Sequence, residues 1–91
     1  NSTTSSSLPE DSAAAVELTL TRANLLRMRH QWRAASSECL AVLRTDPENV
    51  DAHVLLGDIH ADLGESFAAQ HWYRLALNLT PEHPGIRKKL D

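Results

Sequence analysis

Residues 50–81 have the sequence VDAHVLLGDIHADLGESFAAQHWYRLALNLTP, and this stretch decides the fold. Apolar residues recur in it at helical spacing, in two runs separated by Gly64. Glycine accepts the left-handed backbone with which many helices end. Pro81 follows the second run, and a proline pushes the residue before it out of the helical region. The stretch therefore predicts two helices, over 48–63 and 66–79, joined by a tight turn.

Helical spacing of apolar residues continues on both sides of this stretch. It predicts further helices over 12–29 and 31–44, and a short last helix that begins at Pro84. Residues 1–7 contain only asparagine, serine and threonine, which favours a disordered tail. The alternation typical of a strand does not occur in the sequence. We therefore expect an all-α chain.

The chain also matches itself at a shift of 34 residues. Ala34-Ala35 fall on Ala68-Ala69, and Pro47 falls on Pro81. A period of this length with helix–turn–helix content is the spacing of tetratricopeptide repeats. The sequence thus predicts two helical repeats, followed by a closing helix or the start of a third repeat.

Residues 50–81 resemble the tetratricopeptide repeat family most closely. That family has Leu-Gly in the first helix, glycine at the turn, small and aromatic residues in the second helix, and a closing proline. The matching residues here are Leu56, Gly57, Gly64, Phe67, Ala69, Tyr73, Ala76 and Pro81. The small residues would let two helices cross closely, and the aromatic residues would fill the gaps beside them.

The first repeat matches this pattern less well. Thr19, Arg22 and His30 stand where the family has an aromatic residue, a leucine and a glycine. A terminal repeat is often atypical, because one of its sides faces water. The alternative is a shifted register of the first helix.

The resemblance implies antiparallel helix–turn–helix repeats stacked as a short right-handed solenoid. The boundaries are a tail over 1–11, a divergent first repeat over 12–47, a second repeat over 48–81, and a closing helix or third repeat over 82–91. Two repeats are fewer than the roughly three that usually bury a continuous core. We therefore expect the chain either to belong to a larger repeat protein or to pair with a copy of itself.

In this family the first helix of each pair lines a concave groove, so the resemblance implies a scaffold or adaptor module that binds a peptide or partner protein. The residues expected to contact the partner are Asn24, Arg27, Asp51, Val54, Leu55, Asp58, Asp62, Lys88 and Lys89. The groove is acidic in its middle and basic at its end, which fits a partner with basic and apolar features. The carboxylate clamp of chaperone adaptors is not expected, because only Asn24 and Lys89 match it. Self-association, as a possible homo-oligomer, is the alternative function.

Composition and the remaining polar residues argue against other functions. The net charge of −3 argues against a nucleic-acid partner, and no apolar run approaches the ~20 residues needed for membrane insertion. Cys39 lies on an apolar stripe and no phosphate-binding loop occurs, so we expect neither an enzyme nor a cofactor. His53 and His60 share a helical face where the family packs aromatic residues, so we expect packed histidines and no metal. The lone cysteine and the missing signal segment favour a cytoplasmic location.

Overall fold

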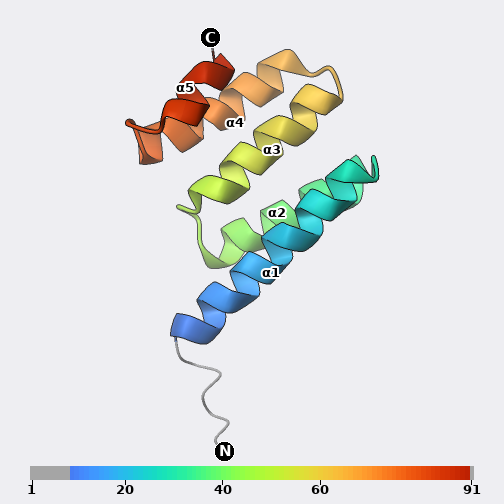
Figure 1. Ribbon diagram of the computed structural model, residues 1–91, viewed down its shortest axis with the longest axis vertical. Helices are drawn as coiled ribbons and strands as arrows, with labels where there is room; N and C mark the ends of the chain where they lie inside the picture. Colours follow the sequence, from blue (N-terminus) through green and yellow to red (C-terminus); the bar gives the residue numbers. More distant parts are fainter. Residues whose placement is uncertain (1–8, 91) are drawn as a thin grey trace, which may run out of the picture.

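The computed structural model describes residues 9–90, with side chains from residue 14 onward, as five helices. They are α1 (Pro9–Met28), α2 (Trp32–Thr45), α3 (Val50–Asp62), α4 (Ser66–Leu79) and α5 (Pro84–Leu90). Short turns make consecutive helices antiparallel, so that α1 with α2 and α3 with α4 form two hairpins (Figure 1). Residues 9–90 contain no strand, and the expected all-α class is confirmed. None of these helices is both long and apolar enough to cross a membrane.

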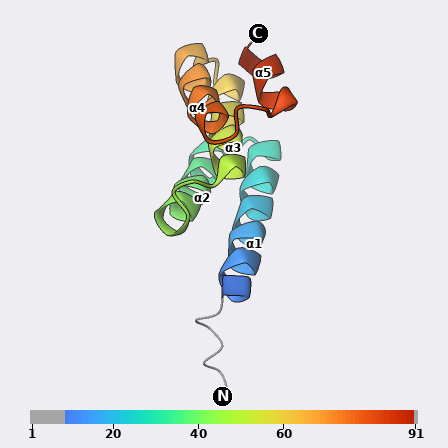
Figure 2. The same cartoon turned by 90° about the vertical axis from the view of Figure 1, so that its left-hand side faces the viewer.

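The first helix begins earlier than expected. α1 starts at Pro9 instead of residue 12, because proline suits the first turn of a helix, where its missing N–H has no helical partner. The expected tail over 1–11 is therefore wrong for residues 9–11, and its other residues lie outside the described part of the chain. The first turns of α1 extend beyond the end of α2 (Figure 2).

The turns within the two hairpins have the same backbone geometry at a shift of 34 residues. His30 and Gly64 both have left-handed φ angles, of 65° and 81°. In each turn the next residue donates its backbone N–H to the carbonyl five residues earlier, at 2.8 Å. The backbone hydrogen bonds that end α2 and α4 correspond at the same shift. The first helix therefore keeps the register of the second repeat, and the geometry does not support the shifted alternative.

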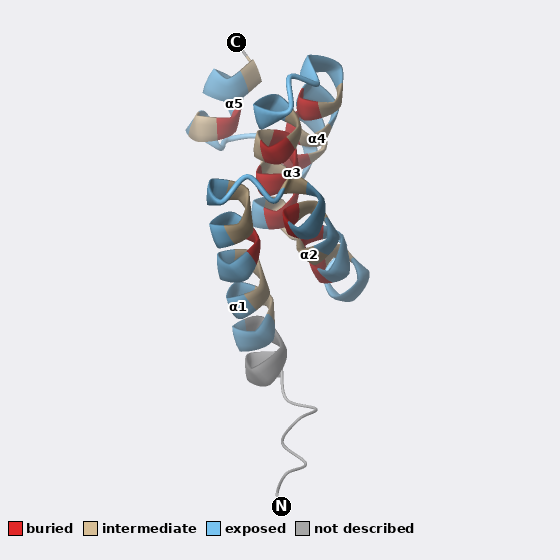
Figure 3. Ribbon diagram, turned by 90° about the vertical axis from the view of Figure 1, so that its right-hand side faces the viewer, coloured by how far each residue is buried: buried red, intermediate tan, exposed pale blue. Residues whose placement is uncertain are grey.

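Buried side chains form two clusters that meet on α3 (Figure 3). The cluster shared by α1, α2 and α3 consists of Ala23, Ala35, Cys39, Leu55, Leu56 and Ile59. The cluster shared by α4 and α5 consists of Ala69, Tyr73, Ala76 and Ile86, with Val50 and Val54 of α3 packed against it. α3 is therefore the helix that connects the two parts of the core.

α3 and α4 cross closely at Gly57. A Cβ atom at this position would overlap the ring of Tyr73, which is 6% exposed. The expected packing of a small residue against an aromatic ring is confirmed here. Phe67, which was expected to fill a similar gap, is 89% exposed. Ala69, Tyr73 and Ala76 form the buried stripe of α4, and Phe67 lies on the opposite side of the helix.

Gly57→Ala is expected to lower the free energy of unfolding by about 1–3 kcal/mol, because overlap with the Tyr73 ring outweighs the gain in helix propensity. Urea unfolding followed by circular dichroism measures this loss. In a double-mutant cycle with Tyr73→Leu, removing the ring should cancel much of the effect of the added methyl group. Additive losses in the cycle would contradict the close crossing.

The left-handed turns give a matched pair of predictions. Gly64→Ala should cost about 1–2 kcal/mol from backbone strain alone, since a Cβ atom there meets nothing within 4 Å. His30→Gly should relieve the same strain and raise the free energy of unfolding by less than about 1 kcal/mol. The gain is smaller because glycine loses more entropy on folding, and because His30 stacks on Trp32 with ring centroids 5.0 Å apart. Changes of the same sign in the two variants would reject the shared turn geometry.

Candidate functional site

Charged side chains link α1, α3 and α5. Arg27 Nη1 of α1 lies 3.0 Å from Asp62 Oδ2 of α3, and Lys89 Nζ of α5 lies 3.1 Å from Asp58 Oδ1 of α3. The two aspartates are one helical turn apart and so share a face of α3. The structure therefore brings four of the predicted groove residues together in two ion pairs.

The carboxylate of Asp58 also holds Tyr73 of α4. The Tyr73 hydroxyl donates to Asp58 Oδ1 at 2.5 Å, and Lys89 Nζ lies 5.7 Å from the centre of the Tyr73 ring. Burial raises the pKa of the Tyr73 hydroxyl well above its usual range, and the hydrogen bond to Asp58 raises that pKa further. Tyr73 therefore stays protonated at neutral pH and remains a hydrogen-bond donor to Asp58.

The other predicted groove residues differ in exposure. Asn24, Asp51 and Lys88 are exposed, and Val54 is half-buried. Leu55 is 9% exposed and belongs to the core cluster of α1, α2 and α3, so its side chain offers little surface to a partner. We call the remaining set the α1/α3/α5 face: Asn24, Arg27, Asp51, Val54, Asp58, Asp62, Lys88 and Lys89. A small hollow of about 290 Å³ lies at one end of this face, beside Arg27 and Asp62.

The two histidines of α3 make hydrogen bonds within the protein. His53 is 7% exposed, and its Nδ1 lies 2.7 Å from the carbonyl oxygen of Asn49. A carbonyl only accepts, so this nitrogen carries the proton and donates. His60 Nδ1 lies 2.6 Å from Glu65 Oε1. The expected packing of these histidines is confirmed for His53, whereas His60 is only half-buried. Among the described side chains, no group of three His, Cys, Asp or Glu residues is placed to hold a metal ion.

Cys39 is buried in the core and is poorly suited to chemistry. Its side chain has no exposed surface. Burial raises the pKa of the thiol to about 12, and the charge of Glu38 contributes to the rise. The thiol therefore stays protonated at neutral pH, whereas a nucleophilic cysteine reacts as the thiolate.

Two surface features were not predicted from the sequence. α1 exposes Leu18, Leu25 and Met28, at 68%, 51% and 66% of their surfaces. Their helical spacing in the sequence places these three side chains on one side of α1, and this spacing was the signal that could have predicted the stripe. A hollow of about 1090 Å³ also lies beside α2, lined in part by Leu40 and Leu63. No sequence pattern predicts this hollow, because the hollow depends on how α2 packs beside the turn between α3 and α4.

Comparison with known proteins gives a partial similarity. No protein-family model matches the chain. The DnaJ protein P58IPK homolog of Arabidopsis thaliana is 31% identical over 77 residues, which cover 85% of this chain. The same residues cover 16% of that protein, so the chain spans a small part of its length.

Two aspartates on α3 should differ sharply in their effect on stability. Asp58→Ala removes the acceptor of the Tyr73 hydroxyl and the partner of Lys89, so it should lower the free energy of unfolding by about 1–3 kcal/mol. Asp51→Ala, which changes an exposed carboxylate on the same helix, should stay within about 0.5 kcal/mol of the parent chain. Chemical unfolding of both variants measures the difference. Equal losses would mean that the Asp58 contacts contribute nothing beyond those of a surface carboxylate.

Proposed function

We propose that this chain is a tetratricopeptide-type interaction module that binds a partner polypeptide over its α1/α3/α5 face. The observation that carries the proposal is the repeated turn geometry, which has the 34-residue period typical of this family. In such repeats the first helices of successive pairs form the binding surface. The similarity to part of a DnaJ protein supports a role as an interaction module within a larger protein.

The charges of the α1/α3/α5 face favour a partner with basic and apolar side chains. α3, the middle helix of the face, contributes Asp51, Asp58 and Asp62. The ion pair between Arg27 and Asp62 is partly exposed, with 27% and 38% of the two side chains accessible. Exposed ion pairs contribute little stability, about 0–1 kcal/mol, so a basic side chain of a partner can replace Arg27 at low cost. The half-buried Val54 offers an apolar contact beside these carboxylates.

The exposed apolar stripe on α1 favours self-association as a second candidate function. Leu18 and Leu25 correspond, at the repeat shift, to Ala52 and Ile59 of α3, which have no exposed surface. Ile59 belongs to the core cluster that α3 shares with α1 and α2. By the same geometry α1 would bury its stripe against another helical pair. That pair would come from a further repeat or from a second copy of the chain.

Titration with a short synthetic peptide of lysine and leucine residues tests the proposed face. We expect shifts in the amide NMR signals of Asn24, Asp51 and Val54, with little change along α2. Asp51→Lys should weaken binding by about fivefold or more, because it reverses one of the negative charges that α3 contributes to the face. Glu82→Lys makes the same charge change at an exposed position outside the face and should leave the affinity unchanged.

Light scattering on the same samples separates the two functions. If the chain binds a partner over the α1/α3/α5 face, we expect it to be a monomer. The Leu25→Glu variant should then bind the peptide as tightly as the parent chain. Self-association through α1 predicts a mass that rises with concentration and returns to that of a monomer in Leu25→Glu. Equal weakening of peptide binding by Asp51→Lys and Glu82→Lys would reject the proposed face.

A further inference from the structure

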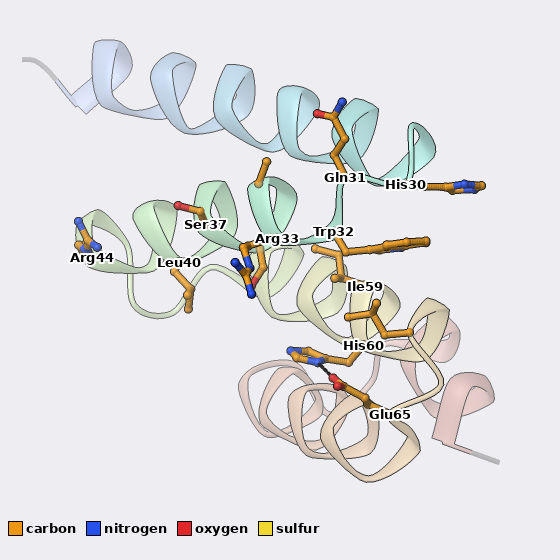
Figure 4. A pocket seen from close by; sticks show the side chains of 13 residues that line it. His30, Gln31, Trp32, Arg33, Ser37, Leu40, Arg44, Ile59, His60 and Glu65 are labelled. Carbon is orange, nitrogen blue, oxygen red and sulfur yellow. Dashed lines mark hydrogen bonds and ion pairs between the residues drawn. The ribbon is translucent and has the colours of Figure 1, made fainter.

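A second recessed surface lies between α2 and the turn that joins α3 to α4. This hollow has a volume of about 1090 Å³, and none of its lining residues belongs to the α1/α3/α5 face. Figure 4 shows Arg33, Leu40 and Arg44 along α2, with His60 and Glu65 on the opposite side of the hollow. Its size is at the upper end of typical ligand pockets, which span roughly 300–1,000 Å³, so it can hold several side chains of a partner.

Apolar side chains from both sides line this hollow. Leu40 of α2 is 43% exposed, and Leu63, which follows α3, is 45% exposed. Trp32 and Ala34 also belong to the apolar part of the lining, whereas Ile59 borders the hollow but has no exposed surface. Exposed leucines that face a common hollow from two elements offer a site for an apolar anchor residue, which loses contact with water when it enters.

The charged groups around the hollow are mostly basic. Arg33 and Arg44 are exposed, and neither forms an ion pair with any side chain that the structure describes. Glu65 is the acidic residue of the lining, and its carboxylate is bound by His60 at 2.6 Å. The chain as a whole has a net charge of −3, so the local charge of the hollow is opposite in sign to the net charge of the chain.

We propose that this hollow docks an acidic, amphipathic segment of a partner protein. An apolar side chain of the segment would lie between Leu40 and Leu63, and its carboxylates would pair with Arg33 and Arg44. Guanidinium groups bind carboxylates through two parallel hydrogen bonds, so the contact is directional as well as strong. Arg33 and Arg44 are three helical turns apart on α2, so the acidic residues of the segment are expected on both sides of its apolar anchor. This site is additional to the α1/α3/α5 face and requires a partner of the opposite charge.

A short fluorescein-labelled peptide of glutamate and leucine residues is the probe for this site. Fluorescence anisotropy should detect binding to the parent chain, and amide NMR signals should shift along α2 and in residues 63–65. Arg33→Glu with Arg44→Glu should weaken binding by about tenfold or more, because both carboxylate contacts become repulsive. Leu40→Ala with Leu63→Ala should weaken binding by about threefold or more through loss of the apolar contact.

The matched control changes two exposed arginines that lie outside the hollow. Arg74→Glu with Arg87→Glu alters the net charge by the same amount and should leave the affinity within about twofold. Circular dichroism of each variant checks that helix content is preserved. If the control pair weakens binding as much as the hollow pair, the attraction is non-specific and the proposal is wrong. Tighter binding of a short single-stranded oligonucleotide than of the acidic peptide would also overturn it, in favour of a phosphate-bearing partner.

Separate titrations with the two peptides distinguish this inference from the proposed function. The acidic peptide and the lysine–leucine peptide should each shift a different set of amide signals of the chain. If the acidic peptide instead shifts Asn24 and Asp51, the hollow is not the site, whatever the outcome for the α1/α3/α5 face. If only the lysine–leucine peptide fails to bind, the proposed function is rejected and the hollow stands.

Discussion

The close crossing of α3 and α4 at Gly57 is the contact on which the rest of the structure depends. Because Gly57 has no side chain, the ring of Tyr73 packs directly on the backbone of α3. That position brings the Tyr73 hydroxyl to the carboxylate of Asp58, and Asp58 in turn binds Lys89 of α5. The absence of a side chain at Gly57 thus sets the distance between α3 and α4. It also influences where α5 packs. Part of the α1/α3/α5 face is arranged by the same contact.

α3 serves both the core and the surface. Its buried side joins the cluster of α1 and α2, and its aspartates form ion pairs with α1 and α5. Asp62 is paired with Arg27 near the surface, so loss of this ion pair should cost little stability. Asp58 is less exposed and accepts a hydrogen bond from a buried hydroxyl, so its removal should lower stability whatever its effect on the proposed binding. Asn24, Asp51 and Lys88 are exposed, so their substitution is the better test of the proposed binding.

The two surfaces differ in electrostatic character. The α1/α3/α5 face carries three aspartates on α3 together with three basic side chains on α1 and α5, whereas the hollow beside α2 is mostly basic with apolar side chains between its arginines. The two proposed partners would contact different side chains, so we expect that binding at one surface leaves the other surface free. α1 also exposes an apolar stripe, for which self-association is the proposed role.

The sequence by itself determined the helices, their turns and the 34-residue period. Glycine, proline and apolar spacing are local signals, and they act through the backbone of a few residues. The tertiary structure decided which side of each helix has a neighbour. Periodicity places residues on a common face but does not say what covers it. For that reason Leu55 proved buried and Phe67 proved exposed, and the hollow beside α2 emerged only when two hairpins were packed together.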